Sequence, residues 1–420
     1  MSEWKDTEMG LIPKDWIDTT VGDLVDQDII EKPLDGNHGE LHPKGSDFVE
    51  DGIPFIMATD INNGKVDLLN CKFITKNQAD SLNKGFSITG DVLLTHKASL
   101  GRTAVVGAIP TPYIMLTPQV TYYRVKNKNK MSNIYLKYYF DSPFFQDTLL
   151  NHGDSGSTRA YVGITAQRDL PIYLPPLTEQ KAIALMLSNL DDKIDLLHRQ
   201  NKTLEAMAET LFRQWFVEEA DEGWEEKPLN DLLEYVVDNR GKTVPTADFG
   251  ISLIATNCIK NNNIFPVYEK VRYISEETYK DWFRAHPKSG DIIFVNKGTP
   301  GCINMVPNPV DFCIAQDMIA LRVNKSVMSN YYLFLYLRSN EIQTQIMNFS
   351  VGTTIPHLKK TDLLKFPILH PNNKLLSDFD KIVDPFFIKM NNNQLQIRTL
   401  EKLRDTLLPK LMSGEVRVEV

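Results

Sequence analysis

The side chains that could do chemistry in this sequence are basic residues beside glycines, not the paired acids and bases of an active site. Lys97 and Lys297 occupy matching places in the two halves of the chain, each after a hydrophobic run and shortly before a glycine, Gly101 or Gly301. A glycine lets the backbone come close to a phosphodiester, and a neighbouring lysine can neutralise the phosphate charge. These two lysines are therefore candidates for gripping phosphate. The alternative is a solvated lysine at the end of a strand.

Several further basic residues have no counterpart in the other half, so they are candidates for reading features that differ between two ligands. They are Arg102 (which aligns with Cys302), Arg159, Arg240 and Lys242. Lys359 and Lys360, which follow Gly352-Thr353-Thr354, are candidates for facing phosphate. An arginine on a loop suits bidentate recognition of guanine in the major groove of DNA, which is worth roughly 1–3 kcal/mol of discrimination. The alternative for each residue is an ordinary surface charge, and Lys359 and Lys360 could instead begin a helix.

Motifs for catalysis and cofactor binding are missing from the sequence. We find no phosphate-binding loop (Gly-x-x-x-x-Gly-Lys-Ser/Thr), no dinucleotide fingerprint (Gly-x-Gly-x-x-Gly), no His-Glu-x-x-His and no Gly-x-Ser-x-Gly. The four cysteines form no Cys-x-x-Cys pair, which argues against a zinc site and a disulfide framework. The adjacent carboxylates Asp191 and Asp192 are expected on the solvated face of a helix. We therefore expect no catalytic residues, no cofactor and no metal.

The composition is that of an ordinary globular chain with an acidic balance. The 420 residues are 42% hydrophobic and 24% charged, and the formal net charge is −8. A nucleic-acid surface on this chain must be a local basic patch, because the chain as a whole is not basic. The sequence has no apolar run of membrane-spanning length and no secretory signal. We expect a cytoplasmic protein with reduced thiols and no membrane partner.

The chain repeats itself once, with a period too long for a solenoid, whose repeats run to about 50 residues. Thr203-Leu204-Glu205 recurs 196 positions later as Thr399-Leu400-Glu401, and Trp16 recurs 208 positions later as Trp224. We expect an α+β protein of four parts. They are a globular α/β domain over 1–177, a long helix over 178–218, a second globular α/β domain over 219–374 and a second long helix over 375–415.

Short β-rich runs and aromatic helices are predicted within the two globular parts. Val92-Leu93-Leu94 and the run 103–106 read as adjacent strands around a glycine turn, and 292–294 begins the equivalent pair in the second half. Tyr135–Phe145 and Tyr331–Ile342 predict short helices, and we expect their rings in the core rather than as platforms for stacked bases.

The two long helices carry residues at alternating spacings of four and three, from Ile183 to Trp215 and from Phe379 to Leu411. This pattern predicts coiled-coil packing. The first helix leads from the first domain to the second, and the second helix can only lead back. If the two helices pair, they pair antiparallel.

Asn201 and Asn393 are expected to face each other in this coiled coil. The register that fits the pattern matches residues whose numbers sum to 594, and 201 + 393 = 594. Two amides in a seam can satisfy each other and specify the register; the alternative is two polar positions that are merely tolerated. Pro385 predicts a kink in the second helix or a new helix start with Asp384 as its cap.

The order of these parts resembles the DNA specificity subunits of type I restriction–modification systems, over essentially the whole chain. Each half has a Trp-led domain, a Gly-Asp-hydrophobic strand and a Gly-Ser/Thr-Thr segment (156–158 and 352–354), and the chain closes on Leu407–Glu415. The first long helix starts with the Pro-Leu-x-Glu-Gln run 176–180, whereas Pro371-Asn372-Asn373-Lys374 lacks the Glu-Gln. This departure concerns the start of the second helix and not the architecture.

The resemblance implies two target recognition domains that each read one half of a split, asymmetric DNA site, with the helices as a ruler between them. It implies three partners: double-stranded DNA, two modification (methyltransferase) subunits that carry S-adenosylmethionine, and restriction (translocase-nuclease) subunits. The chain itself is then a non-catalytic recognition subunit. One alternative is a recognition module for a methyltransferase of another defence system. The other is a coiled-coil adaptor, which would lack the steep salt dependence of duplex binding.

Lengthening both helices by one heptad tests the ruler. Seven residues inserted after Leu197, together with seven before Ile397, keep the seam in register and add about 10 Å at roughly 1.5 Å per residue. The unread spacer between the half-sites should grow by about three base pairs of roughly 3.4 Å each, while both half-site sequences stay the same. Methylation sites recovered in vivo measure the spacer. Retained methylation with an unchanged spacer would show that the helices are not the ruler.

Overall fold

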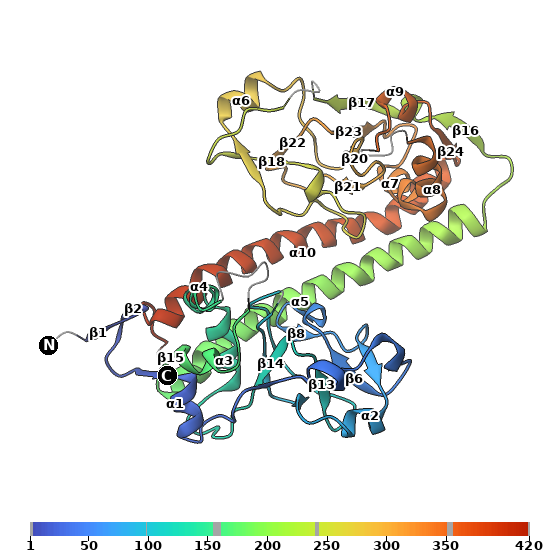
Figure 1. Ribbon diagram of the computed structural model, residues 1–420. Coiled ribbons are helices and arrows are strands. Elements are labelled where there is room, and N and C mark those ends of the chain that lie inside the picture. The colour runs from blue at the N-terminus through green and yellow to red at the C-terminus, as the bar shows by residue number, and fades with distance from the viewer. Residues whose placement is uncertain (1–2, 98, 154–160, 240–242, 351–355, 419–420) are drawn as a thin grey trace. The chain divides into compact units, whose positions relative to one another are not determined.

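The structure, a computed structural model, describes residues 3–97, 99–153, 161–239, 243–350 and 356–418. The chain divides into two compact units: residues 1–194 together with 398–420, and residues 195–397. Each unit contains a globular α/β part and a stretch of both long helices (Figure 1). Both ends of the chain therefore belong to the first unit.

Two sheets form the globular part of the first unit. The four-stranded sheet is antiparallel, in the order β12 (Thr103–Val105), β11 (Val92–Thr95), β14 (Val120–Tyr123) and β4 (Leu34–Asp35). The five-stranded sheet has the order β10 (Phe86–Ser87), β13 (Ile114–Leu116), β6 (Ile53–Ile56), β9 (Lys72–Ile74) and β5 (Phe48–Val49), and its β13–β6 pair is parallel.

Shorter elements complete the first unit. Two-stranded pairs are β1 (Trp4–Thr7) with β2 (Gly10–Pro13), β3 (Ile17–Thr20) with β15 (Pro171–Leu174), and β7 (Ile61–Asn62) with β8 (Lys65–Val66). The helices of the globular part are α1 (Val21–Asp26), α2 (Lys76–Asp80), α3 (Asn133–Asp141) and α4 (Pro143–Asn151). Short 3-10 turns are η1 (Gly39–Leu41), η2 (Gly45–Asp47), η3 (Ala58–Asp60) and η4 (Ala166–Asp169).

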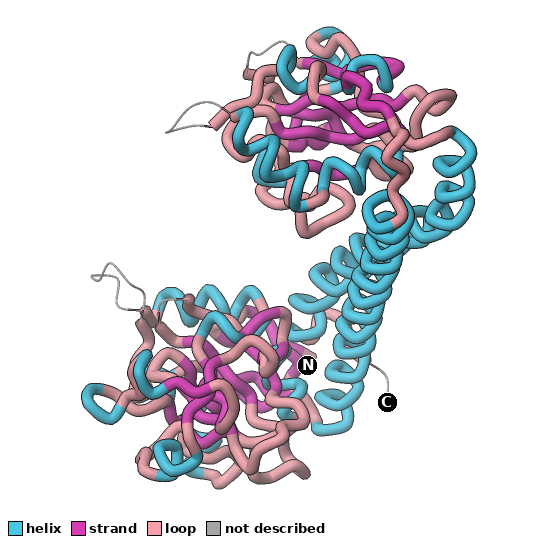
Figure 2. The backbone as a smooth tube through the Cα atoms, turned by 90° about the vertical axis from the view of Figure 1, so that its right-hand side faces the viewer, coloured by secondary structure: helices cyan, strands magenta, loops and turns pink. Residues whose placement is uncertain are grey.

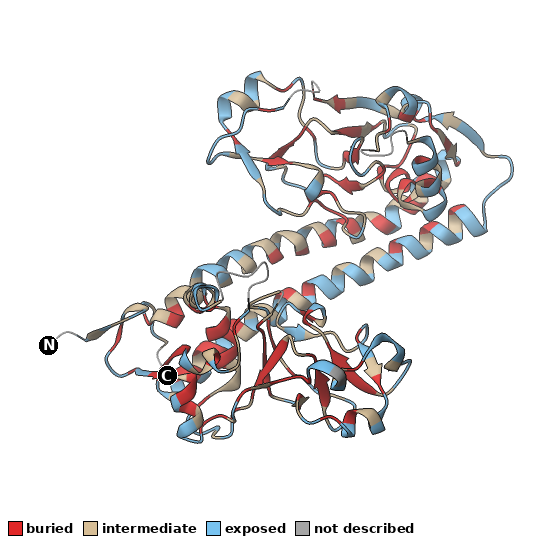
Figure 3. Cartoon of the chain, in the orientation of Figure 1, coloured by how far each residue is buried: buried red, intermediate tan, exposed pale blue. Residues whose placement is uncertain are grey.

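The second unit repeats this plan. One sheet is antiparallel and has the order β17 (Leu233–Asp238), β23 (Met318–Val323), β20 (Ile292–Val295) and β21 (Ile303–Met305). The second sheet has the order β19 (Arg272–Ile274), β18 (Ile251–Ile254) and β22 (Phe312–Ile314). β16 (Glu225–Pro228) pairs with β24 (Pro367–His370). The helices are α6 (Glu276–Asp281), α7 (Asn330–Arg338), α8 (Asn340–Phe349) and α9 (Lys360–Leu363), and the 3-10 turns are η6 (Leu229–Leu232) and η7 (Thr256–Cys258). In each unit the strands lie inside and are largely buried (Figures 2 and 3).

The predicted strand pairs are confirmed, and each predicted aromatic helix is two helices. β11 pairs with β12, and β20 pairs with β21, both antiparallel. Ser142 ends α3 and caps α4, and Ser339 divides α7 from α8 in the same way. Pro143 favours extended backbone at Ser142, which breaks the helix there. The expected core role of the rings is confirmed, because Tyr135 and Tyr332 are fully buried.

The second long helix, α10 (Asn373–Ser413), runs through Pro385 as one element. A fresh helix start at this proline was therefore the wrong expectation. Proline removes one helix hydrogen bond, but the residues on both sides of it, Val383 and Phe387, are buried in the core of the second unit. Burial of this apolar face outweighs the lost hydrogen bond and continues the helix.

The two long helices form an antiparallel coiled coil, as predicted. In the second unit, the Asn393 amide donates to Asn201 Oδ1 at 2.8 Å, and the rings of Trp215 and Phe379 have centroids 6.0 Å apart. From the first contact to the second, residue numbers rise along α5 (Leu177–Arg213) and fall along α10, so the two helices run in opposite directions. α5 continues as a π-helical turn over Gln214–Glu218.

Asp191 in the first unit corrects the expectation of a solvated carboxylate. It accepts hydrogen bonds from the Tyr138 hydroxyl at 2.7 Å and from Arg404 of α10 at 3.0 Å. Burial raises the pKa of Asp191, but the Tyr138 hydroxyl and the charges of Lys137 and Arg404 outweigh it and leave the pKa below its usual value. Asp191 therefore joins α3, α5 and α10, a role that its position outside the heptad seam did not indicate.

Replacing Asn393 alone by leucine should destabilise the second unit. Asn201 then loses its partner in a buried seam, which should lower the free energy of unfolding by about 1–3 kcal/mol. Replacing both asparagines by leucine should recover most of this loss, because two apolar side chains then pack against each other. Urea denaturation measures the difference, with exposed Asn392→Leu as the matched control. Equal losses in the single and double variants would contradict the pairing.

Candidate nucleic-acid interface

The recurring Gly-Asp pair at the start of β11 and β20 belongs to the scaffold of each sheet. Asp91 is buried and accepts two hydrogen bonds from Arg124, at 2.8 Å each. Asp291 is held in the same way by Arg322, at 3.1 and 2.8 Å. Burial raises the pKa of Asp291, and the Arg322 guanidinium opposes this shift. These repeated groups tie neighbouring strands together and are not free to read bases.

The glycines after the two candidate lysines make close contact with a helix. Gly101 has φ +87°, and a Cβ there would lie 2.1 Å from Gln146 Oε1 of α4. Gln146 also donates its amide to the Gly101 carbonyl at 2.9 Å. Gly301 and Gln343 of α8 repeat this contact, again at 2.9 Å. The space beside each glycine is thus occupied by a glutamine side chain of the adjacent helix, which requires a glycine at this position. The approach to a phosphodiester stays a prediction.

Lys97 and Lys297 lie where their strands end, next to a second segment of their own unit. Lys97 forms an isolated antiparallel bridge with Tyr161, and its Nζ lies 5.5 Å from the centre of the Tyr161 ring. Lys297 forms the same bridge with His357, and its side chain is exposed. The backbone positions match, so both lysines remain candidates for a contact made in the same way by both units.

The other predicted contact residues are distributed differently. Arg102 is exposed, and its Nη1 lies 3.2 Å from Asn62 Oδ1 and within hydrogen-bonding distance of two backbone carbonyls of the same loop region. Lys359 is exposed at the start of α9, and Lys360 forms an ion pair with Asp238 at 2.7 Å. Arg159, Arg240 and Lys242 lie outside the residues that the structure describes.

A cluster that the sequence did not indicate lies at the end of β4. Asp35 is 1% exposed, forms an ion pair with Lys84, and accepts a hydrogen bond from His38 Nε2 at 2.7 Å. His96, at the end of β11, is fully buried beside it and contacts the Thr121 hydroxyl and the Pro118 carbonyl. Burial lowers the pKa of His96 to about 4, so this ring is neutral at physiological pH and supports its neighbours rather than a phosphate.

Asp238 in the second unit occupies the place of Asp35. Asp35 pairs with Thr121 of β14, and Asp238 with Ile319 of β23, the equivalent strand. Both carboxylates bind a lysine, but Lys84 precedes β10 whereas Lys360 begins α9. The acid recurs while its partner changes.

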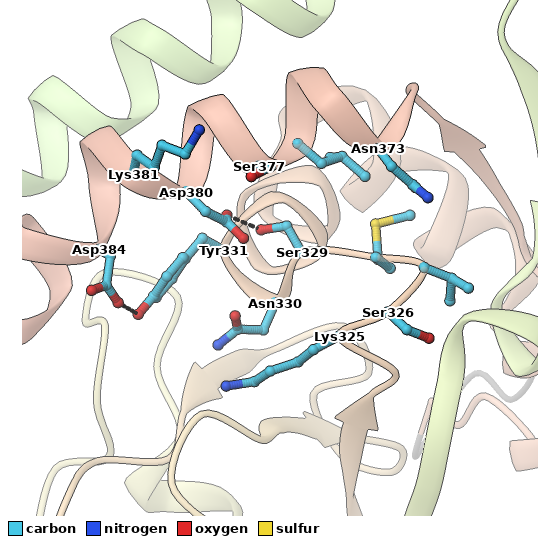
Figure 4. A pocket seen from close by; sticks show the side chains of 13 residues that line it. Lys325, Ser326, Ser329, Asn330, Tyr331, Asn373, Ser377, Asp380, Lys381 and Asp384 are labelled. Atoms are coloured by element: carbon cyan, nitrogen blue, oxygen red, sulfur yellow. Dashed lines mark hydrogen bonds between the residues drawn. The ribbon is translucent and has the colours of Figure 1, made fainter.

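A concave site of the second unit is a cavity of about 480 Å³ between α7 and α10 (Figure 4). Its two half-buried carboxylates are already engaged, Asp380 by the Ser329 hydroxyl and Asp384 by the Tyr331 hydroxyl. Burial raises the pKa of Asp380. In the first unit, the amide of Gln180 fills the equivalent place and donates to the Lys130 carbonyl at 3.1 Å.

Metal binding and membrane insertion find no support in the described residues. No group of three or more histidine, cysteine, aspartate and glutamate side chains is arranged there to hold a metal ion. None of the helices in the described part of the chain combines the length and the apolar character that a transmembrane segment needs.

The fold defines a class: a duplicated α/β scaffold with two long paired helices. The family model of the type I restriction modification DNA specificity domain matches twice, at residues 13–206 and 221–396. The chain belongs to this family, and it is a type I restriction–modification specificity subunit with two target recognition domains.

Similar proteins span the whole chain. It is 27% identical to the type I restriction enzyme MjaIX specificity subunit of Methanocaldococcus jannaschii, over 100% of this chain and 97% of that protein. It is 24% identical to the E. coli EcoBI specificity subunit over 54% of this chain and 48% of that protein. The crystal structure of the S subunit from M. genitalium shares the fold, with a TM-score of 0.58 and 15% identity over 94% of this chain and 96% of that one.

Removing either strand-end lysine should weaken duplex binding without changing sequence preference. Lys97→Ala and Lys297→Ala should each reduce the slope of log K against log salt by about 0.9, because one fewer phosphate is neutralised. Titrations of the methyltransferase complex at several salt concentrations measure the slope. Exposed Lys76→Ala on α2 is the matched control. A similar change in the control, or a change of preferred sequence, would refute the phosphate role.

Proposed function

We propose that this subunit reads a bipartite, asymmetric DNA site, with one half-site for each target recognition domain. The observation that carries the proposal is the contrast between repeated and changed groups. The contacts that build the sheets recur: Asp91–Arg124 and Asp291–Arg322 are equivalent. The groups at the strand ends differ, and His96 of the first domain is replaced by Asn296 in the second. Two such domains suit two different half-sites.

The outer faces of the long helices support the docking of two modification subunits. Large apolar side chains are exposed there: Leu185 is 62% exposed and Leu403 45% in the first unit, and Met207 is 44% and Ile388 52% in the second. Apolar side chains that are exposed on a surface can serve protein contacts. Each unit thus offers its own helical face, in line with one methyltransferase per target recognition domain. Restriction subunits would join the complex so formed.

We infer further that the chain is non-catalytic. Its carboxylates at the concave site are held by hydroxyls, and its buried histidine is part of a hydrogen-bonded cluster. S-adenosylmethionine and the methyl-transfer chemistry then belong to the modification subunits, and ATP-driven translocation and cleavage to the restriction subunits. This chain contributes the choice of DNA sequence.

Methylome sequencing of cells that express the chain with its cognate methyltransferase tests the proposal. The methylated motif should be split and non-palindromic, because the two domains differ at their strand ends. Arg159→Ala should relax one half of the motif, and Arg240→Ala the other half. A continuous palindrome, or relaxation of both halves by Arg240→Ala, would overturn the assignment of one half-site to each domain.

A further inference from the structure

Asp35 holds the segment that follows β4 in a single place. Its carboxylate is almost fully buried, and Lys84, from a loop far along the chain, forms an ion pair with it. The next residue, Gly36, packs so closely that a Cβ would lie 1.9 Å from the Leu116 carbonyl oxygen. Asn37 then donates its amide to the Lys84 carbonyl at 2.6 Å. Three successive residues are thus locked against the body of the domain.

His38 is the first side chain of this segment that reaches solvent. Its side chain is 50% exposed, and its Nε2 donates to Asp35 Oδ2 at 2.7 Å. A carboxylate can only accept, so Nε2 carries a proton, and in the neutral form of the ring Nδ1 is an acceptor. Among the described residues, Nδ1 has no hydrogen-bond partner. The imidazole is therefore fixed at one edge and available at the other.

The surroundings of His38 match those of a base-reading group. The buried ring of His96 lies beside the same carboxylate, with its Nε2 3.9 Å from Asp35 Oδ2, and Lys97 follows His96 directly in the chain. The ring thus shares a neighbour with the strand-end lysine that we assign to a phosphate. A phosphate contact fixes the position of a protein on the duplex, and a rigid group beside it can then read a base edge.

We propose that His38 is a specificity-determining residue of the first target recognition domain and that Asp35 and Lys84 are its positioning residues. This inference rests on the proposed function and deepens it. The free Nδ1 acceptor would receive a hydrogen bond from an exocyclic amino group in the major groove, N6 of adenine or N4 of cytosine. Guanine and thymine present acceptors at the corresponding positions, so His38 discriminates against them.

The second domain supports the role of the carboxylate independently. Asp238 stands at the equivalent strand position and is again paired with a lysine, Lys360, from a different element. The carboxylate recurs although its lysine partner comes from an unrelated element. We infer that in both domains the carboxylate holds the segment that follows the strand. The groups that this segment carries are then free to differ between the two domains.

The test compares methylation by complexes of the full chain with its methyltransferase on a library of randomised sites. His38→Ala should reduce discrimination at one position of one half-site by about 5- to 150-fold, the equivalent of roughly 1–3 kcal/mol, and leave the other half-site unchanged. Lys84→Met should relax the same position, because the ring loses its fixed orientation. Asp238→Asn should affect the other half-site only. Exposed His198→Ala on α5 is the matched control.

The outcomes separate this inference from the proposed function. If the parent chain yields no split motif, the proposed function fails. If it yields a split motif that His38→Ala leaves intact, or if His38→Ala weakens methylation equally at all sequences, only the role of His38 fails. Thermal unfolding of Asp35→Asn and Lys84→Met shows whether the domain stays folded. Relaxed preference in a Lys84→Met protein of unchanged melting temperature supports a positioning role, and unchanged preference refutes it.

Discussion

Both target recognition domains depend on a buried ion pair between a strand and its neighbour. Asp91 with Arg124, and Asp291 with Arg322, join the start of the central strand to the end of the strand beside it. Each arginine also donates to a backbone carbonyl, Arg124 to that of Phe86 at 2.9 Å. Removing one partner would leave a buried charge uncompensated, at a cost of about 3–5 kcal/mol. The pair holds the register in which the strand ends are presented.

That register explains why the two ends of each domain differ in kind. The end at which the chain enters the central strand carries the repeated ion pair. The opposite end carries a repeated lysine, Lys97 or Lys297, next to a residue that differs, His96 or Asn296. A rigid sheet can support such variation, because its backbone hydrogen bonds do not depend on the side chains at the strand ends. The antiparallel helices add their own pairing, with Asn201 against Asn393 in the second unit.

Local patterns in the sequence predicted the strand pairs, the heptad seam and the partners within it, because these depend on spacing along one element. They failed where packing between elements decides. Asp191 lies outside the seam, yet three side chains from α3 and α10 contact it. Proline ends many helices, but the apolar residues around Pro385 are buried and hold this helix together. Gly101 lies beside a glutamine of α4, which no neighbouring residue in the sequence indicates.

The sequence by itself determined that the chain is a duplicated α+β protein with two long helices and without catalytic motifs, because repeats, heptads and motifs are all read along the chain. Only the tertiary structure decided where the candidate reading group lies. Asp35 belongs to the same segment as His38, but Lys84 and His96 come from two other segments, and only the fold brings these two beside Asp35. A buried carboxylate needs partners from wherever the chain supplies them. The spacing of residues in the sequence therefore does not identify those partners. The packing of the folded interior does.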